Sequence, residues 1–408
     1  MATFFLIIIY LAFISLGLPD SLLGVSWSLM QSEFGAQLET AGLLFMTIAG
    51  GTIISSFASG AVLKRFGTGI VTFVSVLMTA GALLGFHFAP SIFWLFICAI
   101  PLGLGAGAVD AGLNNYVASH YKAHHMSWLH CFWGVGATMG PVIMSQYISG
   151  QNSWRSGYLA IAGFQFVLVV ILFFTLPLWN KVAGNNNEIA AREHEKTNSG
   201  LNEANPKNQN PLQIRGVKLA LLAFLFYCGA EATMGLWGSS FLVNIKELSV
   251  DVAAKWVSLY YAGITVGRFI TGFITFKVSN RNLIRMGQII ALTGTALLFL
   301  PFPSPFSLVG FIMVGLGLAP IFPCMLQETP IRFGQEHSQT IMGYQMAVAY
   351  TGSTFLPPLL GFIAANSTIG IFPFFIAGFI AIMLLGSEKL NGLLNRNDLL
   401  GRKGRNLI

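Results

Sequence analysis

Residues 13–27 read FISLGLPDSLLGVSW and place a proline and an aspartate, Pro19 and Asp20, inside a long apolar run. The run begins almost at Met1 and exceeds the ~20 residues that a helix needs to cross a bilayer. A carboxylate at the centre of such a helix costs at least ~2.5–3.5 kcal/mol on insertion scales. Asp20 must therefore be paired, hydrated or protonated, and it is the first candidate for a functional group.

The composition is that of a helical membrane protein. The chain has 408 residues, of which 54% are hydrophobic and only 9% are charged, whereas soluble domains carry about 25% charged residues. The net charge of +7 then belongs to basic loops and does not indicate nucleic-acid binding. The four cysteines lie singly in apolar segments, so they predict neither a metal site nor a disulfide framework.

Apolar segments of spanning length recur along the whole chain and predict an all-α membrane protein with twelve transmembrane helices. The first segment lacks a basic start and a small-residue cleavage site, so we interpret it as a retained helix and not as a signal peptide. The twelve segments cover roughly residues 3–28, 38–63, 68–88, 91–119, 126–149, 156–180, 216–241, 251–275, 283–302, 305–327, 338–363 and 368–387.

A polar segment divides the chain into two halves. Residues 182–215 are rich in Asn, Glu and Lys, a composition that cannot bury a core and is typical of a flexible linker. We therefore expect an N-terminal six-helix bundle over residues 1–181 and a C-terminal six-helix bundle over residues 216–387. The linker and a tail over residues 388–408 are expected in the cytoplasm.

Basic residues predict the orientation in the membrane. If the N-terminus is cytoplasmic, eighteen Lys and Arg residues fall in the inner loops, linker and tail. The outer loops then hold only Arg155, Lys246 and Lys255. Because basic residues concentrate on the cytoplasmic side, both termini are expected there, in a plasma-membrane protein with many spans.

The two halves resemble each other in sequence. Asp20 and Gly24 in the first segment correspond to Glu231 and Gly235 in the seventh, 211 residues later. The fourth segment contains GLGAGAVDAGLNNY (103–116), and the tenth contains the similar GLGLAPIFPCMLQET (315–329). Two parallel six-helix repeats related by pseudo-symmetry are one of the known plans of secondary transporters.

Four charged residues lie well inside the predicted helices: Asp20, Asp110, Glu231 and Arg268. Ionisable residues at such depth usually face a cavity and mark an ion or substrate pathway. A structural role is the alternative for each acid, through a hydroxyl, a backbone amide or Arg268. Glu231 and Arg268 lie on adjacent helices and form either a gate or a brace between them.

The acids suit proton coupling. A carboxylate removed from water binds a proton more readily, and the bound proton removes the cost of closing a cavity around a charge. Protonation is thereby linked to a conformational switch. We expect Asp20, Asp110 and Glu231 to carry the coupling proton, with sodium as the alternative ion and no cofactor. Pro19 favours a kinked helix beside Asp20.

Polar and aromatic residues near these acids form a candidate substrate site. Amides hydrogen-bond to hydroxyl groups and aromatic rings pack on C–H faces, so this set suits a polyhydroxylated ligand. Packing inside the protein is the alternative for each tryptophan, as is an inter-helix hydrogen bond for the glutamine. The candidates are Asn114, Asn115, His130, Trp133, Trp237 and Gln345.

At this point the chain resembles a major facilitator transporter of the fucose permease type, the fucose–galactose–glucose proton symporters. Three motifs carry the resemblance: LGLPDSLLG, GLGAGAVDAGLNNYV followed by HHMSWLHCFWGVGATMGP, and FYCGAEATMGLWGSSFL followed by GITVGRFITG. The resemblance implies a central cavity lined by the first, fourth, seventh and tenth helices, with Asp20 and Asp110 as the proton-coupling pair.

The sequence departs from that family at three positions. The fucose permease has Glu at the place of Asp110, which shortens the carboxylate arm here. Sugar-binding relatives often place Asn or Gln near His130. The loop between the second and third helices has Lys64 where the superfamily normally has Asp.

The sequence thus predicts a secondary transporter, with a small sugar or polyol as substrate, the lipid bilayer as surroundings and a monomeric state. Proton-coupled export of a drug, glycoside or lipid-linked sugar is the main alternative. An intramembrane aspartyl protease using Asp20 and Asp110 is a further one, but two residues separate Gly107 from Asp110, where those proteases have Gly-x-Gly-Asp.

A nutrient sensor that does not transport is another alternative, but such sensors commonly carry longer soluble extensions. ATP-driven transport has no phosphate-binding motif to support it, and we expect no enzymatic activity.

Overall fold

The computed structural model describes residues 2–120, 123–151, 153–197, 211–275, 277–299 and 304–405. The α-helices are α1 (Ala2–Gly17), α2 (Leu22–Phe34), α3 (Thr40–His87), α4 (Ile92–His120), α5 (Ala123–Gln151), α6 (Trp154–Thr197), α7 (Val217–Asn244), α8 (Val250–Ile274), α9 (Asn280–Phe299), α10 (Ser304–Leu318), α11 (Ile321–Phe333), α12 (Gln335–Ala365) and α13 (Phe372–Arg405). Two short 3-10 helices, η1 (Pro211–Gln213) and η2 (Ile369–Ile371), precede α7 and α13.

Eleven segments of the described residues are long and apolar enough to cross a membrane, which confirms the predicted class of all-α membrane protein. Helix α3 contains two of them, Thr40–Ser59 and Arg65–His87, with a kink at Gly67. Gly67 has a φ of 77°, which glycine adopts without a steric penalty. The twelfth expected span, 126–149, lies within α5, which is long enough but is not among these eleven segments.

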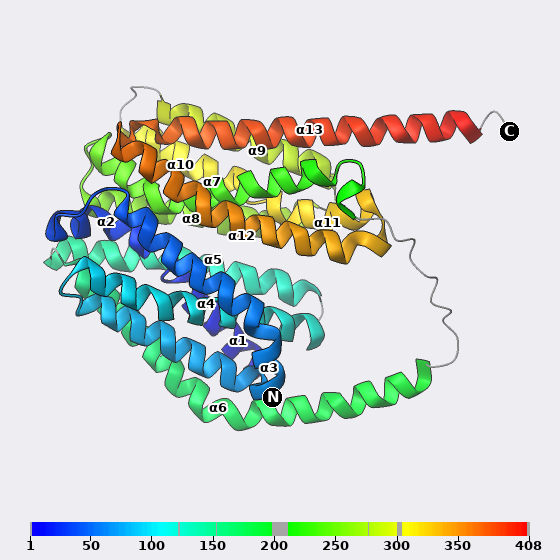
Figure 1. The fold of residues 1–408 in the computed structure, drawn as a ribbon, viewed down its shortest axis with the longest axis horizontal. Helices are drawn as coiled ribbons and strands as arrows, with labels where there is room; N and C mark the ends of the chain where they lie inside the picture. Colours follow the sequence, from blue (N-terminus) through cyan, green and yellow to red (C-terminus); the bar gives the residue numbers. More distant parts are fainter. Residues whose placement is uncertain are drawn as a thin grey trace.

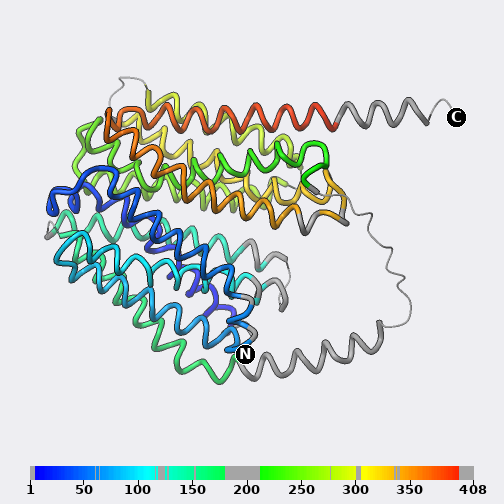
Figure 2. The backbone as a smooth tube through the Cα atoms, in the orientation of Figure 1, coloured from blue at the N-terminus to red at the C-terminus, as the bar shows by residue number. Residues whose placement is uncertain are grey.

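The helices form two groups that repeat the same packing, as the sequence repeats predict. Figure 1 shows α1 to α6 in one group and α7 to α13 in the other, and Figure 2 lets the chain be followed from one to the next. In the first group Thr79 on α3 donates a hydrogen bond to Gln165 on α6 at 2.9 Å. In the second, Gln288 on α9 donates to Ser387 on α13 at 3.0 Å.

Among the described residues, one cluster of buried apolar side chains joins the two groups. This large cluster contains residues of both groups, among them Trp27 and Trp237. Two smaller clusters lie near the chain ends and each belongs to one group, the first running from Phe5 to Trp179 and the second from Val217 to Leu390. We call the end with these separate clusters the termini end and the other the distal end. The two bundles therefore share a core distally and have separate cores at the termini end.

Glycines bring the two bundles into main-chain contact toward the distal end. A Cβ atom added to Gly24 on α2 would overlap the backbone of Gly235 and Leu236 on α7. A Cβ atom added to Gly42 on α3 would likewise meet Pro358 on α12. Small residues allow membrane helices this approach. Gly24 thus packs on the backbone of Gly235, which occupies the equivalent position in the other sequence repeat.

Hydrogen bonds between α5 and α8 close the same side of the interface. The Ser145 hydroxyl donates to the carbonyl of Asp251 at 2.9 Å, and the Ser258 hydroxyl donates to the carbonyl of Thr138 at 2.8 Å. In a hydrocarbon environment each buried backbone acceptor needs a donor. These contacts, with the shared core, hold the distal side closed.

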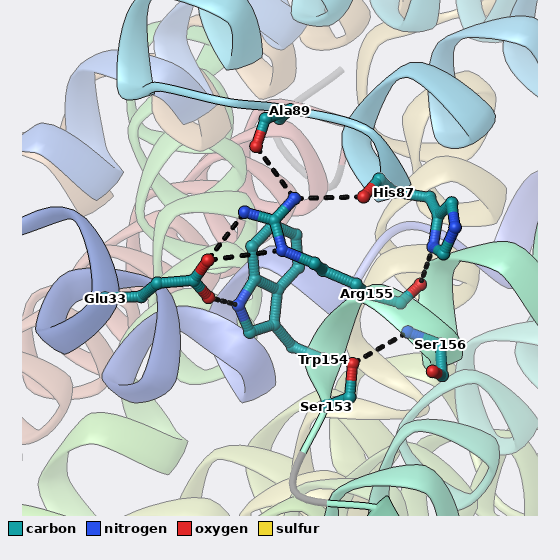
Figure 3. Close-up of polar contacts among 7 residues, drawn as sticks. All are labelled: Glu33, His87, Ala89, Ser153, Trp154, Arg155 and Ser156. Carbon is teal, nitrogen blue, oxygen red and sulfur yellow. Dashed lines mark hydrogen bonds and ion pairs between the residues drawn. The ribbon is translucent and has the colours of Figure 1, made fainter.

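A charged cluster fixes the distal end of the N-terminal bundle (Figure 3). The Arg155 guanidinium at the start of α6 pairs with Glu33 at the end of α2 at 2.6 Å. It also donates to the carbonyls of His87 and Ala89 in the connection between α3 and α4, at 2.9 and 2.7 Å. The Trp154 indole donates to the other Glu33 oxygen at 2.6 Å. One arginine thus ties three connections of the bundle together.

The segments expected to be a linker and a tail are partly helical. Helix α6 continues to Thr197 and includes residues 182–197, while residues 198–210 lie outside the described ranges. Helix α13 likewise continues from the bundle to Arg405. Glu388, where the tail was expected to begin, pairs with Arg285 on α9 at 2.6 Å. The packed C-terminal bundle therefore extends beyond residue 387.

The Gly24 contact gives a test of the distal closure. Gly24→Ala is expected to lower the free energy of unfolding by about 1–3 kcal/mol, because the added methyl group overlaps the α7 backbone. Thermal unfolding of the purified protein in detergent measures the change. Gly81→Ala is the matched control, because a Cβ atom there meets nothing within 4 Å. Equal melting temperatures for the two variants would contradict the close contact.

Candidate functional site

A break between α1 and α2 positions Asp20. Pro19 has no N–H group, so it cannot donate to the carbonyl of Ser15 four residues earlier. That carbonyl instead accepts a hydrogen bond from the side-chain amide of Gln165 on α6, at 2.8 Å. Helix α1 ends at Gly17 and α2 begins at Leu22. The kink expected at Pro19 is confirmed, and its free carbonyl is satisfied by a neighbouring helix.

Asp20 is exposed although it lies in the middle of a membrane-spanning segment. One carboxylate oxygen accepts a hydrogen bond from the indole N–H of Trp133 on α5, at 2.6 Å. Bonds of this length are typical of a charged acceptor. Exposure on the interface side of the bundle means that Asp20 faces a solvent-accessible space between the helices. This is the hydration that a carboxylate at this depth requires.

Trp133 connects Asp20 to the C-terminal bundle. The guanidinium carbon of Arg268 on α8 lies over the Trp133 ring, 5.5 Å from its centre, within the range of a cation–π interaction. Arg268 also pairs with Glu231 on α7 at 3.3 Å and donates to the Tyr227 hydroxyl at 3.2 Å. Asp20, Trp133, Arg268 and Glu231 thus form one continuous chain of contacts across the interface.

Asp110 forms a second group nearby. The Asn114 amide, one helical turn along α4, donates to Asp110 at 2.8 Å. The Tyr350 hydroxyl on α12 approaches the other carboxylate oxygen at 3.5 Å. The side-chain carbonyl oxygen of Asn114 is buried and has no hydrogen-bond partner among the described residues. Asp110 therefore also faces the C-terminal bundle, and Asn114 offers an unused acceptor beside it.

The remaining predicted site residues are distributed differently. His130 on α5 is half-buried and packs edge-on against Phe13. Trp237 is fully buried, and its indole N–H donates to the carbonyl of Pro357 at 2.7 Å. Gln345 is buried and accepts from Thr329 at 3.0 Å within the C-terminal bundle. Trp237 and Gln345 thus lie inside helix contacts in this conformation and are not brought to Asp20. The side chain of Asn115 lies outside the described ones.

Three tyrosines of the site were not predicted from the sequence. Tyr227 contacts Arg268, Tyr350 approaches Asp110, and Tyr261 on α8 packs edge-on against Trp133 at 6.4 Å between ring centres. Tyr227 precedes Glu231 by one helical turn, and this spacing was the one available signal. Tyr261 and Tyr350 reach the site only because α8 and α12 pack against the N-terminal bundle.

The arrangement can bind protons and polar solutes. Carboxylates, an amide, an indole and tyrosine hydroxyls converge from both bundles, and they supply proton acceptors, hydrogen-bond groups and ring faces. Among the described residues no three His, Cys, Asp or Glu side chains converge in a way that could hold a metal ion.

Two six-helix bundles that share a core at one end, with charged residues facing each other between them, define a membrane transporter. A family model described as Major Facilitator Superfamily matches residues 9–357. The chain belongs to the Major Facilitator Superfamily and is a membrane protein with many spans.

Curated relatives are similar over most of the chain at low identity. Bypass of stop codon protein 6 of Saccharomyces cerevisiae is 24% identical over 88% of this chain and 76% of its own length. The Glucose/mannose transporter GlcP of Bacillus subtilis is 24% identical over 68% of this chain and 67% of its own. The Hexuronate transporter of the same organism is 22% identical over 92% and 91%.

Solved structures share the fold. The inward open conformation of the xylose transporter XylE from E. coli has a TM-score of 0.75 at 11% identity and covers 96% of this chain and 95% of that one. A D-xylose-proton symporter has a TM-score of 0.70 at 12% identity over 95% and 96%. These likenesses establish the arrangement of the helices.

The Glu231–Arg268 pair gives a test of whether it braces the C-terminal bundle. Glu231→Gln leaves the partly buried Arg268 charge without its carboxylate and is expected to cost about 1–3 kcal/mol of unfolding free energy. The double variant Glu231→Gln with Arg268→Gln is expected to recover part of this loss, because no charge is left alone. Melting temperatures in detergent measure both. Losses that simply add in the double variant would show that the pair does not act as a unit.

Proposed function

We propose that this transporter couples the movement of a monosaccharide, or of a similar small polar solute, to that of protons by alternating access. The observation that carries the proposal is Asp20: it is exposed at mid-membrane, beside a helix break, and hydrogen-bonded to Trp133 at the interface between the bundles. A carboxylate there can exchange protons with the water that reaches it. Within the superfamily we place the chain with the fucose permease type, on the motifs around Asp20, Asp110 and Glu231.

The substrate class is supported by the groups that face the interface. Asn114 has an unused buried acceptor for a hydroxyl group, and Trp133 and Tyr261 supply aromatic surface for C–H faces. GlcP, one of the curated relatives, is named as a glucose and mannose transporter. D-glucose and D-mannose are therefore the first substrates to test.

The conformation supports alternating access. The distal side is closed by the shared core and by the Gly24 and Gly42 contacts, while the cores separate at the termini end. We assign the termini end to the cytoplasm, because eighteen basic residues fall there against three on the other side. The structure then corresponds to a state in which the site is open to the cytoplasm.

Proton coupling follows from the cost of closing the termini end around the acids. Closure removes water from Asp20 and Asp110, and an ionised carboxylate loses more free energy in that step than a protonated one. The transporter closes most readily when protons neutralise the acids. Release of the proton to the cytoplasm then accompanies release of the solute.

A sugar acid is the second candidate substrate. Among the described residues, Arg268 uses only its Nη2 atom for hydrogen bonds, so Nε and Nη1 are available to a carboxylate. The similar hexuronate transporter spans nearly the whole chain. D-glucuronate therefore belongs in the substrate panel beside the neutral sugars.

Transport by the purified protein in liposomes tests the proposal. With an inward proton gradient, one radiolabelled sugar is expected to accumulate above equilibrium. Asp20→Asn is expected to abolish this accumulation and to retain exchange of labelled for unlabelled sugar, because exchange needs no net proton movement.

Glu388→Gln is the control, since Glu388 lies on α13 at the termini end and pairs with the exposed Arg285 of the same bundle. Accumulation that follows a sodium gradient at fixed pH would contradict proton coupling. Movement of none of the sugars, with movement of a lipophilic or lipid-linked compound, would contradict the substrate class.

A further inference from the structure

We propose that Trp133 makes substrate binding depend on the protonation state of Asp20, by holding its ring under Arg268 while Asp20 is ionised. The inference rests on the proposed function and adds a positioning residue to it. Trp133 was predicted only as a surface for the substrate. Its contacts also couple the charge of Asp20 to the position of the ring against Arg268 in the opposite bundle.

Two interactions fix the Trp133 ring. Its indole nitrogen carries a single proton and donates it to Asp20 at 2.6 Å, and the residue makes no other side-chain hydrogen bond. One ring face carries the Arg268 guanidinium at 5.5 Å. The ring also makes an edge contact with Tyr261, at 6.4 Å between centres, and packs against buried apolar residues. A negative group therefore holds the edge of the ring while a positive group covers its face.

Ring position then follows from the charge of Asp20. A hydrogen bond to a charged acceptor is roughly twice as strong as one between neutral groups. Protonation weakens the restraint on the indole N–H, while the ring can still turn about its side-chain bonds. A ring released from Arg268 exposes its face, the surface on which the C–H face of a sugar packs. The ionised state of Asp20 thus keeps that surface occupied, and the protonated state makes it available.

Other ionisable groups lie within electrostatic reach of this device. Glu231 on α7 and Asp110 on α4 act on Asp20 through their charges, and the Tyr261 hydroxyl on α8 senses Asp20 in turn. On α5 itself, His130 lies one turn before Trp133 and interacts electrostatically with Arg268. Among the described residues, the side chain that hydrogen-bonds to the Asp20 carboxylate is Trp133.

The device also links the two bundles. Trp133 belongs to the N-terminal bundle and Arg268 to the C-terminal bundle, where Arg268 is held by Glu231 and Tyr227. A change at Asp20 therefore reaches a contact between the halves through one side chain. Proton binding before sugar binding is the order that this geometry favours.

The pH dependence of sugar affinity tests the proposal. Uptake of radiolabelled D-glucose into liposomes gives KM in acidic and alkaline buffer, at about pH 6 and about pH 8, on either side of neutrality. For the unchanged protein KM is expected to rise about tenfold on going to the alkaline buffer, because the sugar then competes with the hydrogen bond from Trp133 to the charged Asp20. Trp133→Phe keeps an aromatic ring and removes the N–H, so its KM is expected to be nearly the same in both buffers.

Trp94→Phe is the matched control. Trp94 also donates a single indole hydrogen bond, to the carbonyl of Gly85 at 3.1 Å. It lies at the distal start of α4 and has no hydrogen bond to Asp20. This variant is expected to keep the tenfold pH dependence. If Trp133→Phe raises KM over that of the unchanged protein by the same factor in both buffers, the tenfold pH dependence is retained. That result would overturn the proposal, because the ring would then act only by packing.

A measurement without sugar separates this inference from the proposed function. The protein is labelled with fluorotryptophan, and its eight tryptophans are followed by fluorine NMR. The resonance that Trp133→Phe removes is expected to shift between the alkaline and acidic buffers. In Asp20→Asn it is expected to stay at its acidic position in both, because asparagine carries no charge.

The outcomes are distinguishable. A resonance that shifts with pH through Asp20 supports the inference even if no sugar is transported, in which case only the proposed substrate fails. A resonance that does not shift, or that shifts equally in Asp20→Asn, overturns the inference even if glucose uptake is proton-coupled. Should Trp133→Phe fail to fold, Trp133→Tyr serves for both the assignment and the KM comparison.

Discussion

The carbonyl of Ser15 and the amide of Gln165 form the contact on which the site depends. In hydrocarbon each backbone acceptor must find a donor, and Pro19 removes the one that Ser15 would have had. Gln165 replaces it and accepts a hydrogen bond from Thr79, so side chains of α6 and α3 stabilise the break after α1. The break turns Asp20 toward the interface and leaves it exposed. Without Gln165 the Ser15 carbonyl would stay unsatisfied, because Pro19 has no N–H to offer it even in a regular helix.

Much of the fold could be predicted from the sequence because hydrocarbon limits the possible structures so strongly. Long apolar segments separated by polar ones indicate spanning helices, and the Asp20–Gly24 and Glu231–Gly235 repeats indicate two related bundles. The contact between Gly24 and Gly235 could not be predicted, since it depends on how two distant helices cross. The end of the C-terminal bundle was placed too early, because composition does not reveal that Glu388 meets Arg285.

The site was predictable in its charges and much less so in its partners. Asp20, Glu231 and Arg268 stand out because ionisable residues are rare in apolar segments. Tryptophans are common there for packing alone, so nothing in the sequence separates Trp133, which meets Asp20, from Trp237, which meets a backbone carbonyl. Tyr350 gives no signal either, since its approach to Asp110 requires the two bundles to be assembled.

The distal closure combines close backbone approaches, at Gly24 against Gly235 and at Gly42 against Pro358, with a shared apolar core. Backbone atoms and apolar side chains do not titrate, so these contacts carry no pH response of their own. Any signal that opens it must come from the side chains in the middle of the molecule, where Asp20, Trp133 and Arg268 meet. The distal closure is therefore made of uncharged contacts that prevent leakage, whereas the response to protons is confined to a small set of ionisable groups between the two bundles.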